Sequence, residues 1–154
     1  MDEDGAKLPQ HLKKEWFKRS DVQLEFNRQI VEATRRVACA YKPNPAFYSG
    51  AARKEALRNT IEYIREVAPE IPVILDAKQG YIGNTNDCYA EDYFDYYRAD
   101  AVTVHSYMCM ESMKPFLDRA NKGVIVLCRT SNPGAGEFQD LQVPVSVEKA
   151  EHWG

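Results

Sequence analysis

Three charged side chains stand at the ends of two apolar runs in the first half of the chain. Lys42 follows the run 37–41, and Asp76 and Lys78 follow the run 71–75. Residues two positions apart on a strand point to the same face, so Asp76 and Lys78 should lie side by side. A carboxylate can hold an ammonium group in its charged form, and a fixed ammonium group can stabilise an anion that forms during a reaction.

A structural ion pair that closes a strand end would use the same residue types. Such pairs also perturb titration, so the spacing alone favours neither interpretation. A lone lysine at this position is usually a solvated surface residue. Lys42 favours the catalytic interpretation, because two neighbouring strands would then deliver a lysine to the same rim, around the single carboxylate of Asp76.

Four short apolar runs alternate with segments of helical spacing. They cover 37–41, 71–75, 101–104 and 124–128. Because they are rich in β-branched residues and lack strict alternation, they predict strands buried on both faces of a parallel sheet. Their starts are 34, 30 and 23 residues apart, near the roughly 31 residues per unit of an eight-unit barrel.

The intervening segments predict four helices. Asp21 is the expected N-cap of the first, whose apolar residues are Leu24, Phe26, Ile30, Val31 and Ala33. The second has an apolar stripe made of Ala56, Leu57, Ile61, Ile64 and Ala68. The third and fourth are expected over 87–97 and 110–120. The fold class is therefore α/β, and the pattern alone leaves a barrel and an open doubly wound sheet as alternatives.

The composition is that of one ordinary globular domain of 154 residues, with a formal charge of −3 that gives no reason to expect nucleic acid binding. The four cysteines form no CxxC or zinc-type spacing, and we expect Cys39 and Cys128 to act as small hydrophobic residues inside apolar runs. No secretory signal or membrane-length apolar run is found, so a cytoplasmic location is the expectation.

Four segments together resemble one enzyme family. The segment ILDAKQGYIGNT at 74–85 is similar to the signature DAKxxDIxxT of orotidine 5'-monophosphate decarboxylases. The segments CAYKPNPAFY at 39–48, ADAVTVHSYM at 99–108 and VLCRTSNPGAGEFQ at 126–139 resemble the branch of that family found mainly in bacteria and some protists. The resemblance spans about 21–142, and leaves an N-terminal extension at 1–20 and a tail at 143–154.

The resemblance implies a (β/α)8 barrel, of which this chain would carry about four units, corresponding to the family's strands two to five. It implies conversion of orotidine 5'-monophosphate to UMP and carbon dioxide, the last step of de novo pyrimidine biosynthesis. It also implies a homodimer or higher self-association and no metal or organic cofactor. The even charge balance and the lack of a membrane-length apolar run predict neither nucleic acid nor membrane as a partner.

The resemblance also implies roles for five residues. Lys42 and Asp76 would belong to the charged network at the ribose and carboxylate of the substrate, and Lys78 would stabilise the C6 carbanion and protonate it. Thr85 would reach the active site of the neighbouring subunit. Ser131 would hydrogen-bond to the pyrimidine ring.

The chain departs from the family pattern at three positions. Tyr81 replaces the second aspartate of the signature, so one negative charge per site is missing, and we expect this phenol to pack at an interface. Ser106 and Cys109 replace the proline and glycine of a PYxG turn, where a positive φ would make a cysteine cost roughly 1 kcal/mol. His105 beside that turn is more simply explained as a hydrogen-bonded structural group than as a base.

Segments corresponding to the family's first strand and to its later, phosphate-binding strands are missing from 1–20 and from 143–154. A half barrel has two open edges, so we expect self-association. Two alternatives to the decarboxylase stay open. One is a noncatalytic relic or interaction module that keeps the half barrel; the other is a different enzyme on a similar barrel, for which Tyr81 is the main support.

Overall fold

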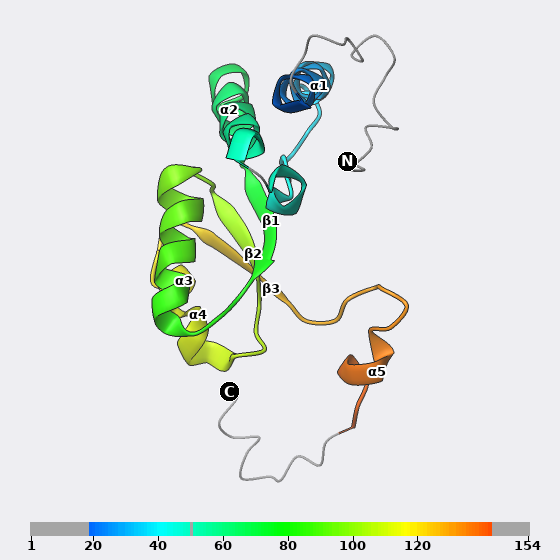
Figure 1. Cartoon of the computed structure of the whole chain (residues 1–154), viewed down its shortest axis with the longest axis vertical. Coiled ribbons are helices and arrows are strands. Elements are labelled where there is room, and N and C mark those ends of the chain that lie inside the picture. Colours follow the sequence, from blue (N-terminus) through cyan, green and yellow to red (C-terminus); the bar gives the residue numbers. More distant parts are fainter. Residues whose placement is uncertain (1–18, 50, 143–154) are drawn as a thin grey trace.

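A computed structural model describes residues 19–49 and 51–142 of the chain. Its centre is a parallel sheet of three strands in the order β1-β2-β3 (Figure 1). The strands are β1 (Ile74–Gln79), β2 (Ala101–His105) and β3 (Gly123–Leu127). Strands β2 and β3 pair without interruption, from Ala101 opposite Gly123 to His105 opposite Leu127. The carboxyl ends of the three strands therefore lie at the same edge of the sheet.

Helices alternate with the strands. They are α1 (Arg19–Thr34), the 3₁₀-helix η2 (Pro45–Tyr48), α2 (Ala51–Val67), α3 (Gly83–Ala90), the π-helix η3 (Glu91–Tyr96), α4 (Cys109–Leu117) and the short α5 (Gly136–Gln139). Helices α1 and α2 lie side by side at one end of the molecule, and α3 and α4 lie side by side along the sheet (Figure 1). The predicted α/β class with a parallel sheet is confirmed.

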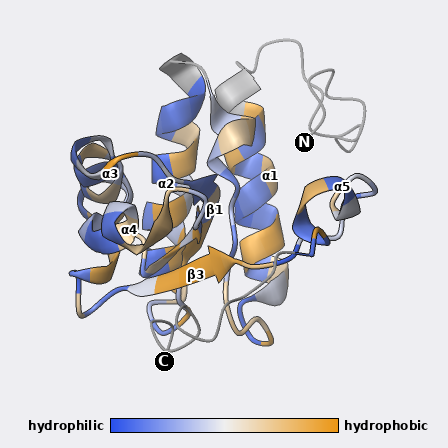
Figure 2. Cartoon of the chain, turned by 90° about the horizontal axis from the view of Figure 1, so that it is seen from below, coloured by the Kyte–Doolittle hydropathy of each residue, from blue (hydrophilic) through white to orange (hydrophobic). Residues whose placement is uncertain are grey.

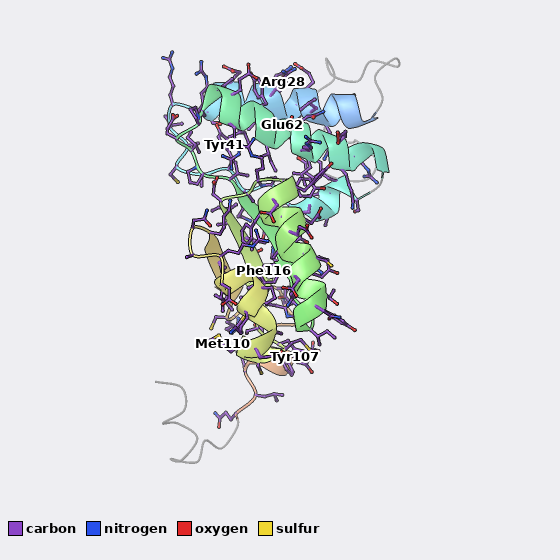
Figure 3. All side chains as sticks on the ribbon, turned by 90° about the vertical axis from the view of Figure 1, so that its left-hand side faces the viewer. Arg28, Tyr41, Glu62, Tyr107, Met110 and Phe116 are labelled. Carbon is purple, nitrogen blue, oxygen red and sulfur yellow. The ribbon has the colours of Figure 1, made fainter. Side chains whose placement is uncertain are left out.

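The hydrophobic core joins α2, the sheet and the α3–α4 layer. The predicted stripe of α2 is confirmed, since all five of its residues are at most 3% exposed. Leu75 of β1 and Val102 and Val104 of β2 are fully buried. Phe116 is also fully buried, and Figure 3 shows it within the α3–α4 layer. Burial of large aliphatic and aromatic side chains of this kind contributes about 1.5–3 kcal/mol each.

The run 37–41 is not a strand, which corrects one of the four predicted strands. Val37 is 83% exposed, and its backbone N–H turns back to the carbonyl oxygen of Thr34 at 2.9 Å. Only Tyr41 pairs with the sheet, through an isolated parallel bridge to Val73. Pro43, which has no backbone N–H, follows almost at once, so the ladder cannot continue.

Several predicted boundaries were also wrong. Strand β1 begins at Ile74 and extends through the charged residues to Gln79, because Asp76 and Lys78 are part of the strand rather than its end. Asp21 lies inside α1 instead of capping it. The third predicted helix begins earlier, at Gly83, and the fourth covers Cys109–Leu117. The predicted extension and tail lie almost entirely outside the described residues.

The apolar stripe predicted for α1 is only partly buried. Val31 is 2% exposed, whereas Ile30 is 46% exposed. Helix α1 packs mainly against α2, so only a narrow face of it is covered. The contact is partly polar: the side-chain amide of Asn27 donates to the Tyr48 hydroxyl at 2.7 Å and to Thr60 Oγ1 at 3.0 Å.

All four cysteines are exposed free thiols, which corrects the prediction that Cys39 and Cys128 are buried. Cys39 lies in the turn-rich segment before Tyr41. Cys128 follows β3, which is an edge strand and is covered on neither face as fully as β2 is. Figure 2 shows the hydrophobic colour of β3, and Ile125 and Val126 are 45% and 41% exposed.

Candidate active site

The carboxylate of Asp76 lies at the centre of a charged cluster on β1. Its side chain is 11% exposed, and one ammonium group binds each of its oxygens. Lys42 Nζ binds Oδ2, and Lys78 Nζ lies 2.5 Å from Oδ1. The hydroxyl of Thr103 on β2 donates to the same Oδ1 at 3.1 Å. The structure therefore brings together the three charged residues that the sequence singled out.

A local irregularity of β1 places Lys78. The register between β1 and β2 shifts between Leu75 and Gln79, and Lys78 has a positive φ of 49°. The backbone N–H of Lys78 donates to Thr103 Oγ1 at 2.9 Å instead of to a carbonyl of the ladder. Bulges of this kind redirect a side chain, and they are common beside active sites.

Thr103 was not identified from the sequence. It joins the Asp76 carboxylate to the Lys78 backbone, and its side chain is buried. The signal that could have found it is a polar residue in the middle of the apolar run Ala101–His105, because a buried hydroxyl needs hydrogen-bond partners.

Lys42 reaches Asp76 from a segment that lies along β1 without forming a regular strand. The backbone of Tyr41 bonds to Pro72 and Ile74, and the N–H of Asp76 donates to the carbonyl oxygen of Pro43 at 2.9 Å. These bonds hold the residues on both sides of Lys42 against β1. The ammonium group can therefore reach Asp76 while about half of its side chain stays exposed.

Asp76 is ionised in this environment. Burial of the carboxyl group raises its pKa, but hydrogen bonds from Lys42, Lys78 and Thr103 outweigh burial and lower the pKa to about 2. Two lysines around one aspartate carry a formal charge of +1. Because both ammonium groups are about half exposed, they can also contact an anionic ligand.

The side chain of Tyr81 has no hydrogen bond to this cluster within the described residues. Its side chain is 53% exposed, and within residues 19–49 and 51–142 it makes no hydrogen bond or ring contact. Its backbone is tightly held: Asn86 Oδ1 accepts the Tyr81 N–H at 2.9 Å, and Asn86 Nδ2 donates to the carbonyls of Tyr81 and Ser112 at 2.7 and 2.6 Å. Asn86, which was not identified from the sequence, is fully buried and anchors this loop to α4.

His105 is a packing residue in the described part of the chain. A Cβ atom at Gly80 would lie only 2.7 Å from the His105 ring, so the ring sits directly against this glycine. Its Nδ1 is buried and has no hydrogen-bond partner among the described residues. The expected structural role thus rests on close packing, and the expected hydrogen bond is not observed.

Two further predicted site residues lie outside the cluster. Thr85 is half-buried in the first turn of α3, and Ser131 is exposed in the loop after β3. Among the described residues, no hydrogen bond joins either of them to Lys42, Asp76 or Lys78. The roles implied for Thr85 and Ser131 stay predictions.

Two kinds of feature are not found among the described residues. Within 19–49 and 51–142, no group of three or more His, Cys, Asp or Glu side chains is arranged to hold a metal ion. No helix in the same ranges has the length and apolar character needed to cross a membrane.

Comparison with known proteins identifies the family. Residues 21–152 match the model of the orotidine 5'-phosphate decarboxylase / HUMPS family. The chain is 42% identical over 160 residues to an orotidine 5'-phosphate decarboxylase of Cellvibrio japonicus, an alignment that covers 99% of this chain and 58% of the relative. It is 46% identical over 143 residues to that of a Janthinobacterium strain, covering 93% of this chain and 51% of the relative.

Solved structures agree. The OMP decarboxylase of Leishmania donovani superimposes with a TM-score of 0.78 at 40% identity, covering 83% of this chain and 51% of that protein. The Pyrococcus horikoshii decarboxylase matches with a TM-score of 0.64 at 25% identity, over 76% of this chain and 52% of that protein. The chain belongs to the orotidine 5'-phosphate decarboxylase family, is a partial barrel, and spans about half the length of the relatives it matches.

Proposed function

We propose that this chain supplies the lysine–aspartate half of an orotidine 5'-monophosphate decarboxylase site, and that Lys78 is its central catalytic residue. The observation that carries the proposal is the placement of two ammonium groups on one buried carboxylate of β1, close to the edge of the sheet where the parallel strands end. Ligands bind at this edge in barrels and in open α/β sheets.

The chemistry requires a fixed cation. Loss of carbon dioxide from the substrate leaves an electron pair on ring carbon C6, and no cofactor in the proposal accepts it. The Lys78 ammonium would stabilise that carbanion and then transfer a proton to it, which gives UMP. Asp76 would keep this ammonium group charged and oriented before the substrate arrives, so no reorganisation is needed during the reaction.

The other predicted residues complete the proposal. Lys42 would orient Asp76 and contact the ribose side of the substrate, and Ser131 would bind the pyrimidine ring. Tyr81 lies in the loop after β1 and Thr85 in the first turn of α3, and we place both at an interface between two copies of the chain. The half-exposed Tyr81 ring is available for such a contact. A homodimer, or a higher assembly, in the cytoplasm is part of this proposal.

Activity and nucleotide binding test the proposal together. In the full chain we expect calorimetric titration to detect UMP binding, and ultraviolet absorbance to detect decarboxylation of orotidine 5'-monophosphate. Lys78→Ala should lower turnover by about 10²- to 10³-fold, because the cation acts on charge that develops in the transition state. The same change should weaken UMP binding far less, because UMP carries no such charge.

Lys114→Ala is the matched control, since Lys114 is an exposed lysine on α4 without an ion pair among the described residues. It should leave both measurements unchanged. A wild-type chain that binds no UMP would overturn the proposed function. Tyr81→Asp restores the charge found in the family signature, and a higher turnover in this variant would identify Tyr81 as the residue that limits the chain.

One observation favours the noncatalytic alternative. The half-exposed β3 edge, with Ile125 and Val126, is a surface that a partner protein could cover. An interaction module of this kind would self-associate or bind a partner without binding UMP, so the same titration separates the two functions.

A further inference from the structure

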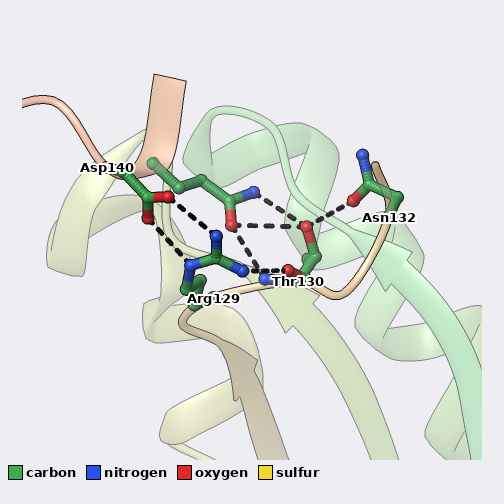
Figure 4. Close-up of polar contacts among 5 residues, drawn as sticks. Arg129, Thr130, Asn132 and Asp140 are labelled. Atoms are coloured by element: carbon green, nitrogen blue, oxygen red, sulfur yellow. Dashed lines mark hydrogen bonds and ion pairs between the residues drawn. The ribbon is translucent and has the colours of Figure 1, made fainter. Parts of the chain in front are cut away.

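The segment after β3 folds back on itself through a compact set of polar contacts (Figure 4). Arg129 binds both carboxylate oxygens of Asp140, with Nε 2.8 Å from Oδ1 and Nη2 2.8 Å from Oδ2. Its remaining nitrogen, Nη1, donates to the carbonyl oxygen of Thr130 at 2.9 Å. The Arg129–Asp140 pair thus joins the beginning of this loop to its end.

A second set of bonds joins Thr130 to Gln139. The carboxamide oxygen of Gln139 accepts the backbone N–H of Thr130 at 2.8 Å, and its Nε2 donates to Thr130 Oγ1 at 2.9 Å. The Thr130 hydroxyl in turn lies 2.6 Å from the carboxamide oxygen of Asn132 and donates to it. Ala135 is 4% exposed, and its N–H closes the turn onto the carbonyl oxygen of Asn132 at 3.0 Å.

Ser131 differs from its neighbours in this loop. In the described part of the chain its hydroxyl has no hydrogen-bond partner, and the residue is exposed. The guanidinium group of Arg129, the hydroxyl of Thr130 and the carboxamide oxygen of Asn132 are all engaged within the loop. These three groups are therefore used within the loop, whereas the Ser131 hydroxyl is available to a ligand.

We propose that Arg129, Asp140 and Gln139 are positioning residues that hold Ser131 in place for a pyrimidine nucleotide. This inference rests on the proposed function, because it takes Ser131 as the residue that binds the ring. A loop that is ordered before the ligand arrives loses less conformational entropy on binding. Two parallel hydrogen bonds from one guanidinium also fix the geometry more closely than a single contact does.

Because the Arg129–Asp140 pair is exposed, we expect it to affect the order of the loop more than the stability of the fold. The side chains of Arg129 and Asp140 are 54% and 51% exposed, and exposed ion pairs contribute little to global stability. The hydrogen bonds of the pair lower the pKa of Asp140 and raise that of Arg129, so both groups stay charged near neutral pH. Loss of the pair should therefore loosen the loop without unfolding the protein.

Asp140→Asn is the direct test, since asparagine keeps the shape but has no charge and only one oxygen in place of the two that bind Arg129. Calorimetric titration of the full chain with UMP should show a Kd at least fivefold higher than for the wild type. Asp95→Asn is a closely matched control. Arg119 Nη1 binds both oxygens of Asp95 at 2.6 and 2.8 Å, and the Asp95 side chain is 53% exposed but belongs to η3. This control should not change the Kd for UMP.

A double-mutant cycle with Ser131→Ala separates positioning from a merely structural role. If Asp140 acts through Ser131, then Asp140→Asn should weaken UMP binding in the wild type and have no further effect once Ser131 is alanine. Independent, additive effects would overturn the inference. A wild-type chain without UMP binding would overturn the proposed function and this role with it, whereas wild-type binding that Asp140→Asn leaves unchanged would overturn this role alone.

Discussion

At the scale of single residues, Asp76 determines the electrostatics of the candidate site. It is nearly buried, and a buried carboxylate is costly unless it is paired. Here the two lysines and Thr103 satisfy both of its oxygens. The same contacts that would prepare Lys78 for catalysis should also stabilise the fold, and they should do so in a pH-dependent way.

We predict that Asp76→Asn lowers the free energy of unfolding by roughly 1–3 kcal/mol at pH 7, as urea denaturation would measure. The pKa of Asp76 is lower in the folded chain, about 2, than its ordinary 3.8. Its stabilising effect is therefore fully present above about pH 4 and is lost as the pH falls towards 2. The difference between wild type and variant should shrink across that window.

Asp118→Asn is a suitable control, because Asp118 is exposed and its side chain makes no ion pair within the described residues. This control should stay close to the wild type at every pH. A difference between wild type and Asp76→Asn that stays constant from pH 5 to pH 2 would contradict the assigned pKa.

At the scale of the elements, helix α4 begins with an unusual residue. Cys109 is its first residue and has a φ of 65°, in the left-handed region that favours glycine. Its N–H closes a turn onto the carbonyl oxygen of Ser106 at 2.8 Å. A positive φ was the condition under which we expected cysteine to be costly at this position, and the structure confirms that condition.

Cys109→Gly should therefore raise the free energy of unfolding by roughly 0.5–1 kcal/mol, measured from the urea midpoint, because glycine removes the left-handed strain. Cys88→Gly is the matched comparison, since Cys88 is also an exposed thiol but lies inside α3. There glycine should lower stability by about as much, owing to its poor helix propensity. Changes of the same sign in both variants would show that backbone conformation is not the cause.

At the scale of the whole molecule, the sheet has an open edge at β3 that another chain could pair with. No strand pairs with the far side of β3 in the described ranges, and β3 ends the sheet. Ile125 is opposite Thr103 in the register, so it lies on the same face as the Asp76 cluster. Exposed apolar strand edges of this kind tend to pair with other chains.

We predict that light scattering on the wild-type chain gives a mass above the 17.6 kDa of the monomer, rising with concentration. Ile125→Lys should shift the measured mass towards the monomer, because a charge at a strand edge opposes pairing. Ile30→Lys on α1 is the control, since Ile30 is 46% exposed and Ile125 45%. A stable wild-type monomer in concentrated solution would rule out self-association through this edge.

Much of this arrangement could be predicted from residue types and spacing. The apolar stripe of α2, the parallel strands at 101 and 124 and the meeting of Lys42, Asp76 and Lys78 were all predicted, because each depends on local periodicity or on strand order. The prediction of a strand over 37–41 was wrong. The apolar residues of this run do not indicate that the chain turns before Tyr41 pairs with Val73.

By itself, the sequence determined which charged groups belong to the candidate site and to which family the chain is similar. Only the tertiary structure decided how those groups are held. The register shift at Lys78, the two bonds of Thr103 and the bond from Asn86 to Ser112 join different elements of the fold. The Arg129–Asp140 bonds join the two ends of one loop. Such contacts depend on where separate segments meet in space, and periodicity along one segment carries no information about that.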